Sequence, residues 1–523
     1  MVTSSISEMT CNRPRLQAGR MPAIEADKLG FDQSSVLRQS KTRRHTVEKY
    51  RSLFINGEWV EPAAGKTGKD INPATGEVAA RVALAGKEDI DRAVSAAQRA
   101  YDDVWFDTPA KERGAMLLKL ADTIEEHADE MARLECIDIG QPISLARMSA
   151  GWTADTLRFF AGCARTPGGM SVQEFERGFT SMLRREPLGV TAGICPWNFP
   201  ILMAGWKIGP ALAAGNTSII KPSSESPLTA LYLAELAADI LPAGVLNVVT
   251  GPGAEIGEAI CRHPDVRLVS MTGDVDTGRR IAAACADTVT RCHLELGGKA
   301  PVIVFDDADL EAFATCVKAA GYDNSGQDCS AACRVLAASS IYDDLLAHLV
   351  PAVESIKVGD PQDPDIEMGP VVSAGQQKSV KGYVDRARSD GATICVGGEV
   401  MDRAGFYYQP TVVADPDQKS EIVQEEVFGP VVTVQRFSDE DQAVAWANDT
   451  IYGLTSAVWT KDLGRALRVS RRLRFGCVWV NTHMMQTNEM PHGGFKQSGY
   501  GSDMSKYAFE EYTQLKHVAA ALG

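Results

Sequence analysis

The stretch that decides the fold is VTAGICPWNFPILMAGWKIGPALAAGNTSIIK, residues 190–221. It begins and ends with short apolar runs, VTAGIC (190–195) and TSIIK (217–221), and a helical segment separates them. Two similar runs follow, GVLNVVTG (244–251) and VRLVSMTG (266–273). This alternation predicts β-α-β units that build a parallel, doubly wound sheet.

A second series of short apolar runs lies further along the chain. It comprises PVIVF (301–305), VVTVQRF (431–437), SAVWT (456–460) and GCVWVNT (476–482). Because 523 residues exceed what one compact core usually holds, two α/β domains are expected to share the chain. The predicted fold class is therefore α/β, with two doubly wound parallel sheets.

Other segments flank these two series. Asn56-Gly57 lies between apolar residues in LFINGEWVE (53–61), which is typical of a type I′ hairpin, and helical patterns dominate residues 87–137. Residues 172–187 alternate in a way that predicts two strands belonging to neither sheet. Residues 1–52 are polar and lack the apolar segment of a secretory signal, so we expect a disordered extension.

Bulk composition narrows the class of protein. The net charge of −15 argues against nucleic-acid binding, which requires a basic face. No apolar run approaches the roughly 20 residues of a membrane helix. The twelve cysteines show no CxxC pairs, which indicates free thiols in a reducing cytoplasm.

The stretch GYDNSGQDCSAACRV (321–335) places two cysteines four positions apart. This spacing does not suit half of a zinc site, a disulfide would close a very small loop, and no HxxxH pair occurs, so no metal is expected. The segment Ser330-Ala331-Ala332-Cys333 is predicted to begin a helix. A helix N-terminus lowers a thiol pKa, so Cys329 is the predicted nucleophile and Cys333 a packing residue.

Three further features suit chemistry. Glu295, between two leucines in LELGGKAP (294–301), should have a raised pKa and could act as a general base, or it could be a solvated strand-end acid. Asn198 in CPWNFP (195–200) could donate to an oxyanion or simply form an Asx turn. MTGDVDTG (271–278) follows a strand and opens a helix, which suits an anionic ligand.

Four motifs occur together and in order: PWNFP (196–200), LELGGKAP (294–301), NSGQDC (324–329) and EEVFGP (425–430). With them, the chain resembles the NAD(P)-dependent aldehyde dehydrogenase superfamily from about residue 53 to residue 520. The resemblance implies that Cys329 attacks the aldehyde carbonyl while Asn198 and the Cys329 backbone N–H hold the oxyanion. It also implies that Glu295 activates the water that hydrolyses the thioester, and that the cofactor is NAD or NADP.

The resemblance assigns cofactor binding to Ile194, Trp197, Lys221, Ser224, Gly251, Gly253, Thr272, Gly273, Asp274, Glu426 and Phe428. Lys221 and Glu426 are expected to hold the two riboses. Ser224 replaces a glutamate that binds the adenosine ribose in NAD-preferring members, which leaves NADP use open. Asp274 replaces the usual serine and is expected to cap the following helix.

Residues 479–513 look most like bacterial γ-aminobutyraldehyde dehydrogenases, which implies oxidation of 4-aminobutanal to 4-aminobutanoate in putrescine degradation. The alternatives are a dehydrogenase for other aliphatic, aromatic or semialdehyde substrates, and a non-catalytic homologue that keeps only the fold. The tunnel residues implied by this comparison are Phe199, Met203, Trp206, Gln486 and His492. Asp138 is a candidate partner for a substrate ammonium.

The same resemblance divides the chain into a dinucleotide-binding domain (53–164 and 188–296), a catalytic domain (297–512) and an oligomerisation arm (165–187 and 513–523). Exposed strand edges in the arm would need a partner, so we expect a homotetramer, or otherwise a dimer. The expected partner molecule is a small aldehyde, with no nucleic acid and no membrane.

Overall fold

The computed structural model describes residue 50 and residues 52–168 and 172–523. Of the predicted extension 1–52, all but Tyr50 and Ser52 therefore lie outside the described residues. Tyr50 is buried, and its ring centroid lies 6.3 Å from that of Trp59. Tyr50 thus already belongs to the folded core.

The first sheet contains eight strands among the described residues, in the spatial order β19, β11, β10, β7, β8, β9, β1, β2. Their bounds are β19 (Gly499–Tyr500), β11 (Arg291–Leu296), β10 (Val266–Gly273), β7 (Val190–Ile194), β8 (Thr217–Lys221), β9 (Leu246–Val248), β1 (Leu53–Ile55) and β2 (Glu58–Val60). The central strands from β11 to β9 are parallel, as predicted. Asn56 and Gly57 join β1 to β2 with φ of 58° and 79°, as a type I′ turn requires.

The second sheet contains seven strands within the described ranges, in the order β14, β15, β16, β13, β12, β17, β18. Their bounds are β14 (Thr393–Val396), β15 (Thr411–Ala414), β16 (Val431–Phe437), β13 (Arg334–Ala338), β12 (Pro301–Val304), β17 (Thr455–Trp459) and β18 (Cys477–Val480). All pairs are parallel except β14 with β15. The α/β fold with two parallel sheets is confirmed.

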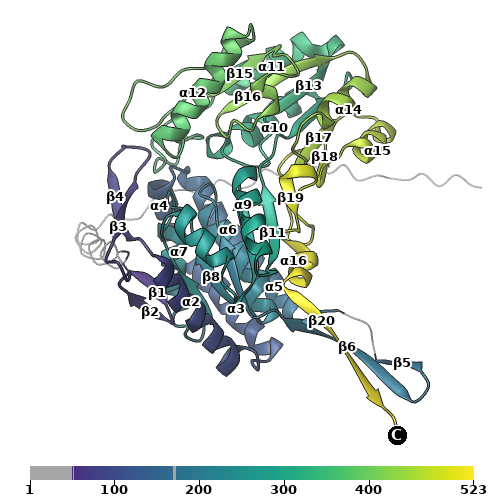
Figure 1. Ribbon diagram of the computed structural model, residues 1–523. Coiled ribbons are helices and arrows are strands. Elements are labelled where there is room, and N and C mark those ends of the chain that lie inside the picture. The colour runs from purple at the N-terminus through teal and green to yellow at the C-terminus, as the bar shows by residue number, and fades with distance from the viewer. Residues whose placement is uncertain (1–49, 51, 169–171) are drawn as a thin grey trace, which may run out of the picture. The chain divides into compact units, whose positions relative to one another are not determined.

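Helices accompany both sheets (Figure 1). With the first sheet lie α2 (Lys87–Ala100), α3 (Ala110–Glu126), α4 (Ala128–Asp138), α5 (Ile143–Arg165), α6 (Pro200–Ala214), α7 (Leu228–Ala237), α8 (Glu258–Cys261), α9 (Val275–Ala286) and α16 (Ser505–Glu511). With the second lie α10 (Leu310–Tyr322), α11 (Tyr342–Glu354), α12 (Ala374–Ser389), α13 (Glu421–Gln424), α14 (Glu440–Asn448) and α15 (Leu463–Arg472). None of the described helices is long and apolar enough to span a bilayer.

Helix α6 is buried along its whole length and connects β7 to β8. Two of its glycines allow close packing on α5, because a Cβ at Gly205 would lie 2.7 Å from Thr153 and a Cβ at Gly209 would lie 2.7 Å from Phe160. The chain leaves the helix at Gly215, whose φ of 97° suits a C-terminal glycine cap. Its packing on α5 fixes α6, and with it the position of the PWNFP turn at its start.

Two small sheets complete the fold. Strands β5 (Gln173–Glu176), β6 (Phe179–Pro187) and β20 (Thr513–Ala521) form a separate antiparallel sheet, which Figure 1 shows apart from both large sheets. It corresponds to the predicted arm. Strands β3 (Thr67–Ile71) and β4 (Val78–Ala83) form a hairpin.

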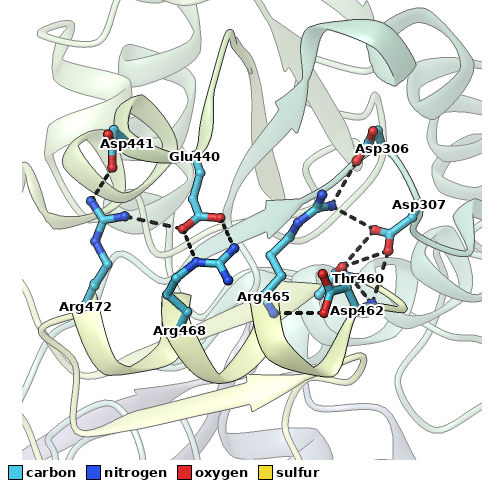
Figure 2. A network of polar contacts seen from close by, with 9 residues as sticks. All are labelled: Asp306, Asp307, Glu440, Asp441, Thr460, Asp462, Arg465, Arg468 and Arg472. Carbon is cyan, nitrogen blue, oxygen red and sulfur yellow. Dashed lines mark hydrogen bonds and ion pairs between the residues drawn. The ribbon is translucent and has the colours of Figure 1, made fainter.

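Ion pairs fasten α15 to its neighbours (Figure 2). Arg468 and Arg472 both contact Glu440 of α14, while Arg465 contacts Asp307 after β12. The arginines and acids retain substantial exposure, so each pair contributes only about 0–1 kcal/mol. The network orients a surface helix rather than building the core.

Candidate active site

A cavity of about 830 Å³ opens at the carboxyl ends of β7, β8 and β10. Ligands of doubly wound sheets bind at this edge. Glu426 and Phe428, which lie just before β16 of the second sheet, line the same cavity. Both halves of the chain therefore contribute to one site.

The three predicted catalytic residues all line this cavity. Cys329 follows α10, Glu295 lies in β11, and Asn198 lies in the turn between β7 and α6. Glu295 and Asn198 are buried, whereas Cys329 keeps partial exposure. A nucleophile, a carboxylate and an amide donor from three distant segments thus meet at one place.

The loop before Cys329 has an unusual backbone. Asn324, Ser325 and Gly326 have φ of 50°, 59° and 68°, and the two non-glycine residues each cost about 1–2 kcal/mol in this region. Side-chain hydrogen bonds hold the turn: Asn324 Nδ2 donates to the carbonyl of Asn198 at 2.7 Å, and Gln327 Nε2 donates to the carbonyl of Asn324 at 2.9 Å. The loop that carries Cys329 is therefore tied directly to the turn that carries Asn198.

The predicted helix at Ser330 is wrong. The chain continues from Cys333 into β13, which pairs with β12 and β16. The local helical propensity of Ser-Ala-Ala-Cys is overridden by this pairing at the centre of the second sheet. Cys329 accordingly has no helix N-terminus beside it.

The predicted lowering of the Cys329 pKa is wrong for the same reason. Burial raises the pKa of this thiol well above its usual range, and the negative charges of Glu295, Asp328 and Glu426 raise it further. Burial also raises the pKa of Asp328 to about 6. Burial and the nearby charges both favour the protonated thiol, so its activation as a nucleophile requires a proton acceptor within the site.

Glycines permit the close approach of the motifs. A Cβ at Gly297 would clash with the carboxylate of Glu426, and a Cβ at Gly298 would clash with the carbonyl oxygen of Cys329. The backbone N–H of Gly298 also donates to Glu426 Oε1 at 2.7 Å. The two glycines of LELGGKAP are thus required by neighbours from NSGQDC and EEVFGP.

Three of the predicted tunnel residues gather beside Glu295. His492 Nε2 lies 3.4 Å from Glu295 Oε1, the rings of His492 and Trp206 have centroids 5.3 Å apart, and Gln486 Nε2 lies 3.5 Å from His492 Nδ1. Burial lowers the pKa of His492, but the adjacent Glu295 carboxylate outweighs it and the net shift is upward. Phe199 and Met203 lie at the start of α6, on the face that also carries Trp206.

Asp138 is not part of this cluster. Its Oδ2 accepts a hydrogen bond of 2.9 Å from the backbone N–H of Leu228, and its carboxyl lies close enough to that of Asp70 for each to affect the other's pKa. Both acids are buried, and burial raises the pKa of each above its usual range. Asp138 does not line the cavity and serves as a buried structural acid.

Most predicted cofactor residues line the cavity together: Ile194, Trp197, Lys221, Gly253, Thr272, Gly273, Asp274, Glu426 and Phe428. Asp274 caps α9 as predicted, with Oδ1 accepting from Thr277 N at 2.9 Å. Ser224 and Gly251 are not in the lining; instead Ser224 Oγ donates to the Gly251 carbonyl at 3.2 Å. Ser223 faces the cavity in place of Ser224.

The cavity wall contains hydrogen-bonding side-chain atoms that are free to bind a dinucleotide. Among the described residues, Thr272 Oγ1 has no hydrogen-bond partner, and Lys221 Nζ donates only to the Pro222 carbonyl, at 2.9 Å. Both side chains therefore have hydrogen-bonding capacity left for a ligand. Burial lowers the pKa of Lys221 to about 8. Trp197 and Phe428 stand edge to face, with centroids 5.2 Å apart. Together they offer polar partners for hydroxyl and phosphate groups and an aromatic wall for a ring.

Sequence reasoning missed a buried ion pair behind the site. Lys207 Nζ lies 2.7 Å from Asp503 Oδ2, and both side chains are inaccessible to solvent. Asp503 exchanges two backbone hydrogen bonds with His492, of 2.8 and 2.7 Å. A single lysine within the apolar run of α6 was the available signal, since a buried ammonium requires a partner.

Comparison with known proteins agrees with this geometry. The model of the aldehyde dehydrogenase family matches residues 59–518. The chain belongs to the aldehyde dehydrogenase family. It is 41% identical over 474 residues to a betaine aldehyde dehydrogenase of Bacillus subtilis (strain 168), covering 90% of this chain and 97% of that protein.

Two other family members are similar to nearly the same extent. A phenylacetaldehyde dehydrogenase of Pseudomonas fluorescens is 42% identical over 479 residues, covering 90% of this chain and 95% of that protein. A crystal structure of betaine aldehyde dehydrogenase from Staphylococcus aureus in complex with NAD+ superposes with a TM-score of 0.89 at 41% identity, covering 92% of this chain and 97% of that one. These relatives share the fold, but their names specify different aldehydes.

Proposed function

We propose that this aldehyde dehydrogenase oxidises an aldehyde to a carboxylic acid with NAD or NADP. The supporting observation is the convergence of Cys329, Glu295 and Asn198 in a cavity whose other wall fits a dinucleotide. A homologue that kept only the fold would have no need for this arrangement. The presence of all three residues therefore favours catalysis over a purely structural role.

Each residue has a defined task in the proposed reaction. Glu295 accepts the thiol proton, and Cys329 Sγ bonds to the aldehyde carbon while Asn198 and the Cys329 N–H stabilise the oxyanion. A bound nicotinamide cofactor supplies the acceptor for the hydride. Glu295, after passing its proton to solvent, takes a proton from water as the water oxygen attacks the thioester. The acid leaves and the Cys329 thiol is restored.

The segment that follows β8 and contains Ser224 decides between NAD and NADP, because the 2′ group of the adenosine ribose is expected to bind there. The Staphylococcus aureus relative was solved with NAD+, which supports NAD. Ser224 is exposed and uncharged, so a 2′-phosphate would meet no carboxylate at that position. We propose NAD as the principal cofactor, with NADP accepted at lower efficiency.

The proposed substrate is 4-aminobutanal, which would place the enzyme in putrescine degradation. Support comes from the resemblance of residues 479–513 to γ-aminobutyraldehyde dehydrogenases and from Trp206, whose ring can attract an ammonium group. Asp138 was the one carboxylate predicted to bind the ammonium, and it is buried outside the cavity lining, so the proposal rests on Trp206 alone for that contact. The names of the relatives, betaine aldehyde and phenylacetaldehyde dehydrogenase, favour a broader specificity as the alternative.

We further propose a cytoplasmic homotetramer, or otherwise a dimer, assembled through the arm of β5, β6 and β20. Phe175, Phe179 and Leu515 on this sheet are 62%, 45% and 58% exposed. Exposed apolar side chains along strand edges favour association with another copy. Sedimentation equilibrium would show a monomer if this proposal is wrong.

The test is a panel of aldehydes, and the rate of nicotinamide reduction is measured with each of them. Wild type and Cys329→Ala would each receive 4-aminobutanal, butanal, betaine aldehyde, succinate semialdehyde and phenylacetaldehyde, with NAD and NADP in turn. Highest kcat/KM for 4-aminobutanal in wild type supports the aminoaldehyde assignment, and highest kcat/KM for another aldehyde rejects it. No turnover of any aldehyde would reject the proposed function itself.

A further inference from the structure

We propose that Glu295, Cys329 and His492 form a binding site for one divalent ion of the zinc type, and that the ion reversibly blocks the enzyme. The three side chains offer a carboxylate oxygen, a thiol sulfur and a ring nitrogen, all within 4.8 Å of one another. This ligand set is typical of zinc. The spacing of Cys329 and Cys333 had argued against a metal, but the additional ligands come from β11 and the segment before β19.

The separation of the ligand atoms is close to that of a metal site. Bonds of about 2.0–2.3 Å arranged tetrahedrally place neighbouring ligand atoms roughly 3.5 Å apart. His492 Nε2 and Glu295 Oε1 already lie 3.4 Å apart. The sulfur of Cys329 lies within 4.8 Å of the other two ligand atoms and turns on a single rotatable bond, so it needs to approach by at most about 1.3 Å.

The polar atoms of this cluster also lack other partners. Glu295 Oε1, Glu295 Oε2 and His492 Nε2 are buried, and none makes a hydrogen bond in the described part of the chain. Leaving a buried carboxylate without hydrogen bonds is costly. A cation bound between these atoms would satisfy the carboxylate and the ring nitrogen together.

The charge balance suits a divalent ion. Binding forms a metal–sulfur bond as the Cys329 thiol releases its proton to solvent, so one thiolate and one carboxylate neutralise two positive charges, and nothing is oxidised or reduced. His492 binds as the neutral ring, and the cavity side can supply water as the fourth ligand. The bound ion occupies both the nucleophile and the base, so aldehyde turnover stops until a chelator removes it.

Metal binding can be measured without any turnover. Metal-free, full-length protein would be titrated with Co²⁺, whose bond to a thiolate gives a near-ultraviolet charge-transfer band, and Zn²⁺ stoichiometry would be measured by equilibrium dialysis. Wild type would be compared with Cys329→Ser, His492→Phe and His492→Asn, and with Cys333→Ser as the matched control thiol. Far-ultraviolet circular dichroism and a thermal melt would verify that each variant folds.

We expect one ion per chain in wild type and in Cys333→Ser, with a charge-transfer band in both. Cys329→Ser should lose the band, and both His492 variants should bind at least about tenfold more weakly. Zn²⁺ should also slow alkylation of Cys329 by iodoacetamide, reversibly with chelator. The proposal is overturned if wild type binds no ion, if the folded Cys329 and His492 variants bind as wild type does, or if Cys333→Ser loses the ion. These outcomes are independent of whether any aldehyde is oxidised.

Discussion

His492 Nε2 lies 3.4 Å from Glu295 Oε1, with both side chains buried. Among the described residues, no other side chain forms an ion pair with the Glu295 carboxylate. The ring is fixed in turn by backbone pairing between His492 and Asp503 and by contact with Trp206. The position of Glu295, the predicted general base, therefore depends on a histidine that was predicted only as a tunnel residue.

Replacement of His492 by phenylalanine should slow the reaction. The substitution keeps the ring contact with Trp206 but removes the imidazole nitrogen that lies 3.4 Å from Glu295 Oε1. Leaving a buried acceptor without a polar neighbour costs about 1–3 kcal/mol. We expect kcat to fall about tenfold or more with a smaller change in KM for the cofactor. His492→Gln, which retains a donor, should recover part of the loss; equal kcat in wild type and His492→Phe would show that the contact is unimportant.

Asn198→Ala should lower kcat by about 10²–10³, because a preorganised donor to the oxyanion contributes at this scale. Steady-state kinetics with the best aldehyde of the panel would measure the change. Asn198 also accepts from Asn324 through its backbone carbonyl, which the substitution leaves intact. An unchanged kcat in a correctly folded variant would remove Asn198 from the mechanism.

The buried pair Asp70 and Asp138 should make stability fall as pH rises. Burial raises the pKa of Asp70 to about 7, whereas a carboxyl in the unfolded chain has a pKa of about 4. The folded protein therefore holds a proton more tightly than the unfolded chain does. The stabilisation is complete below the unfolded pKa and is lost as pH rises through about 7.

Asp70→Asn should reduce this dependence, because only Asp138 then keeps a carboxyl with a raised pKa. Between pH 6 and pH 8, we expect wild type to lose roughly 1 kcal/mol more of its unfolding free energy than the variant does. Chemical denaturation at the two pH values would measure the difference, with Asp103→Asn, at an exposed position, as the control. Equal pH dependence in wild type and Asp70→Asn would refute the raised pKa of Asp70 in the folded protein.

The parallel strands were predictable because their signals are local. Apolar runs such as 190–195 and 217–221 contain enough buried side chains to identify strands, and Asn56-Gly57 identifies its turn by backbone preference alone. The segment after Cys329 was not predictable in this way. Its helical composition is overridden by pairing of β13 with β12 and β16, which are distant in sequence.

The identities of the active-site residues could be predicted, but their environments could not. Cys329, Glu295 and Asn198 were chosen from motif chemistry and do meet in one cavity. The pKa of Cys329 is raised first by burial and then by the charges of Glu295, Asp328 and Glu426, and only the three-dimensional arrangement shows this. The contact of Asp138 with Leu228 and Asp70 was hidden in the same way.

The central claim is that Cys329 carries the acyl group and Glu295 is needed to release it. The direct test mixes Glu295→Gln with aldehyde and NAD, quenches in acid, and analyses the peptides by mass spectrometry. The account predicts that Glu295→Gln forms its first reduced nicotinamide more slowly than wild type does, because Glu295 also takes the thiol proton, and turns over only very slowly after about one per active subunit. Fragmentation of the peptide that carries both Cys329 and Cys333 should place the acyl mass on Cys329. Rapid steady turnover in Glu295→Gln, or an acyl group on another residue such as Cys333, would contradict it.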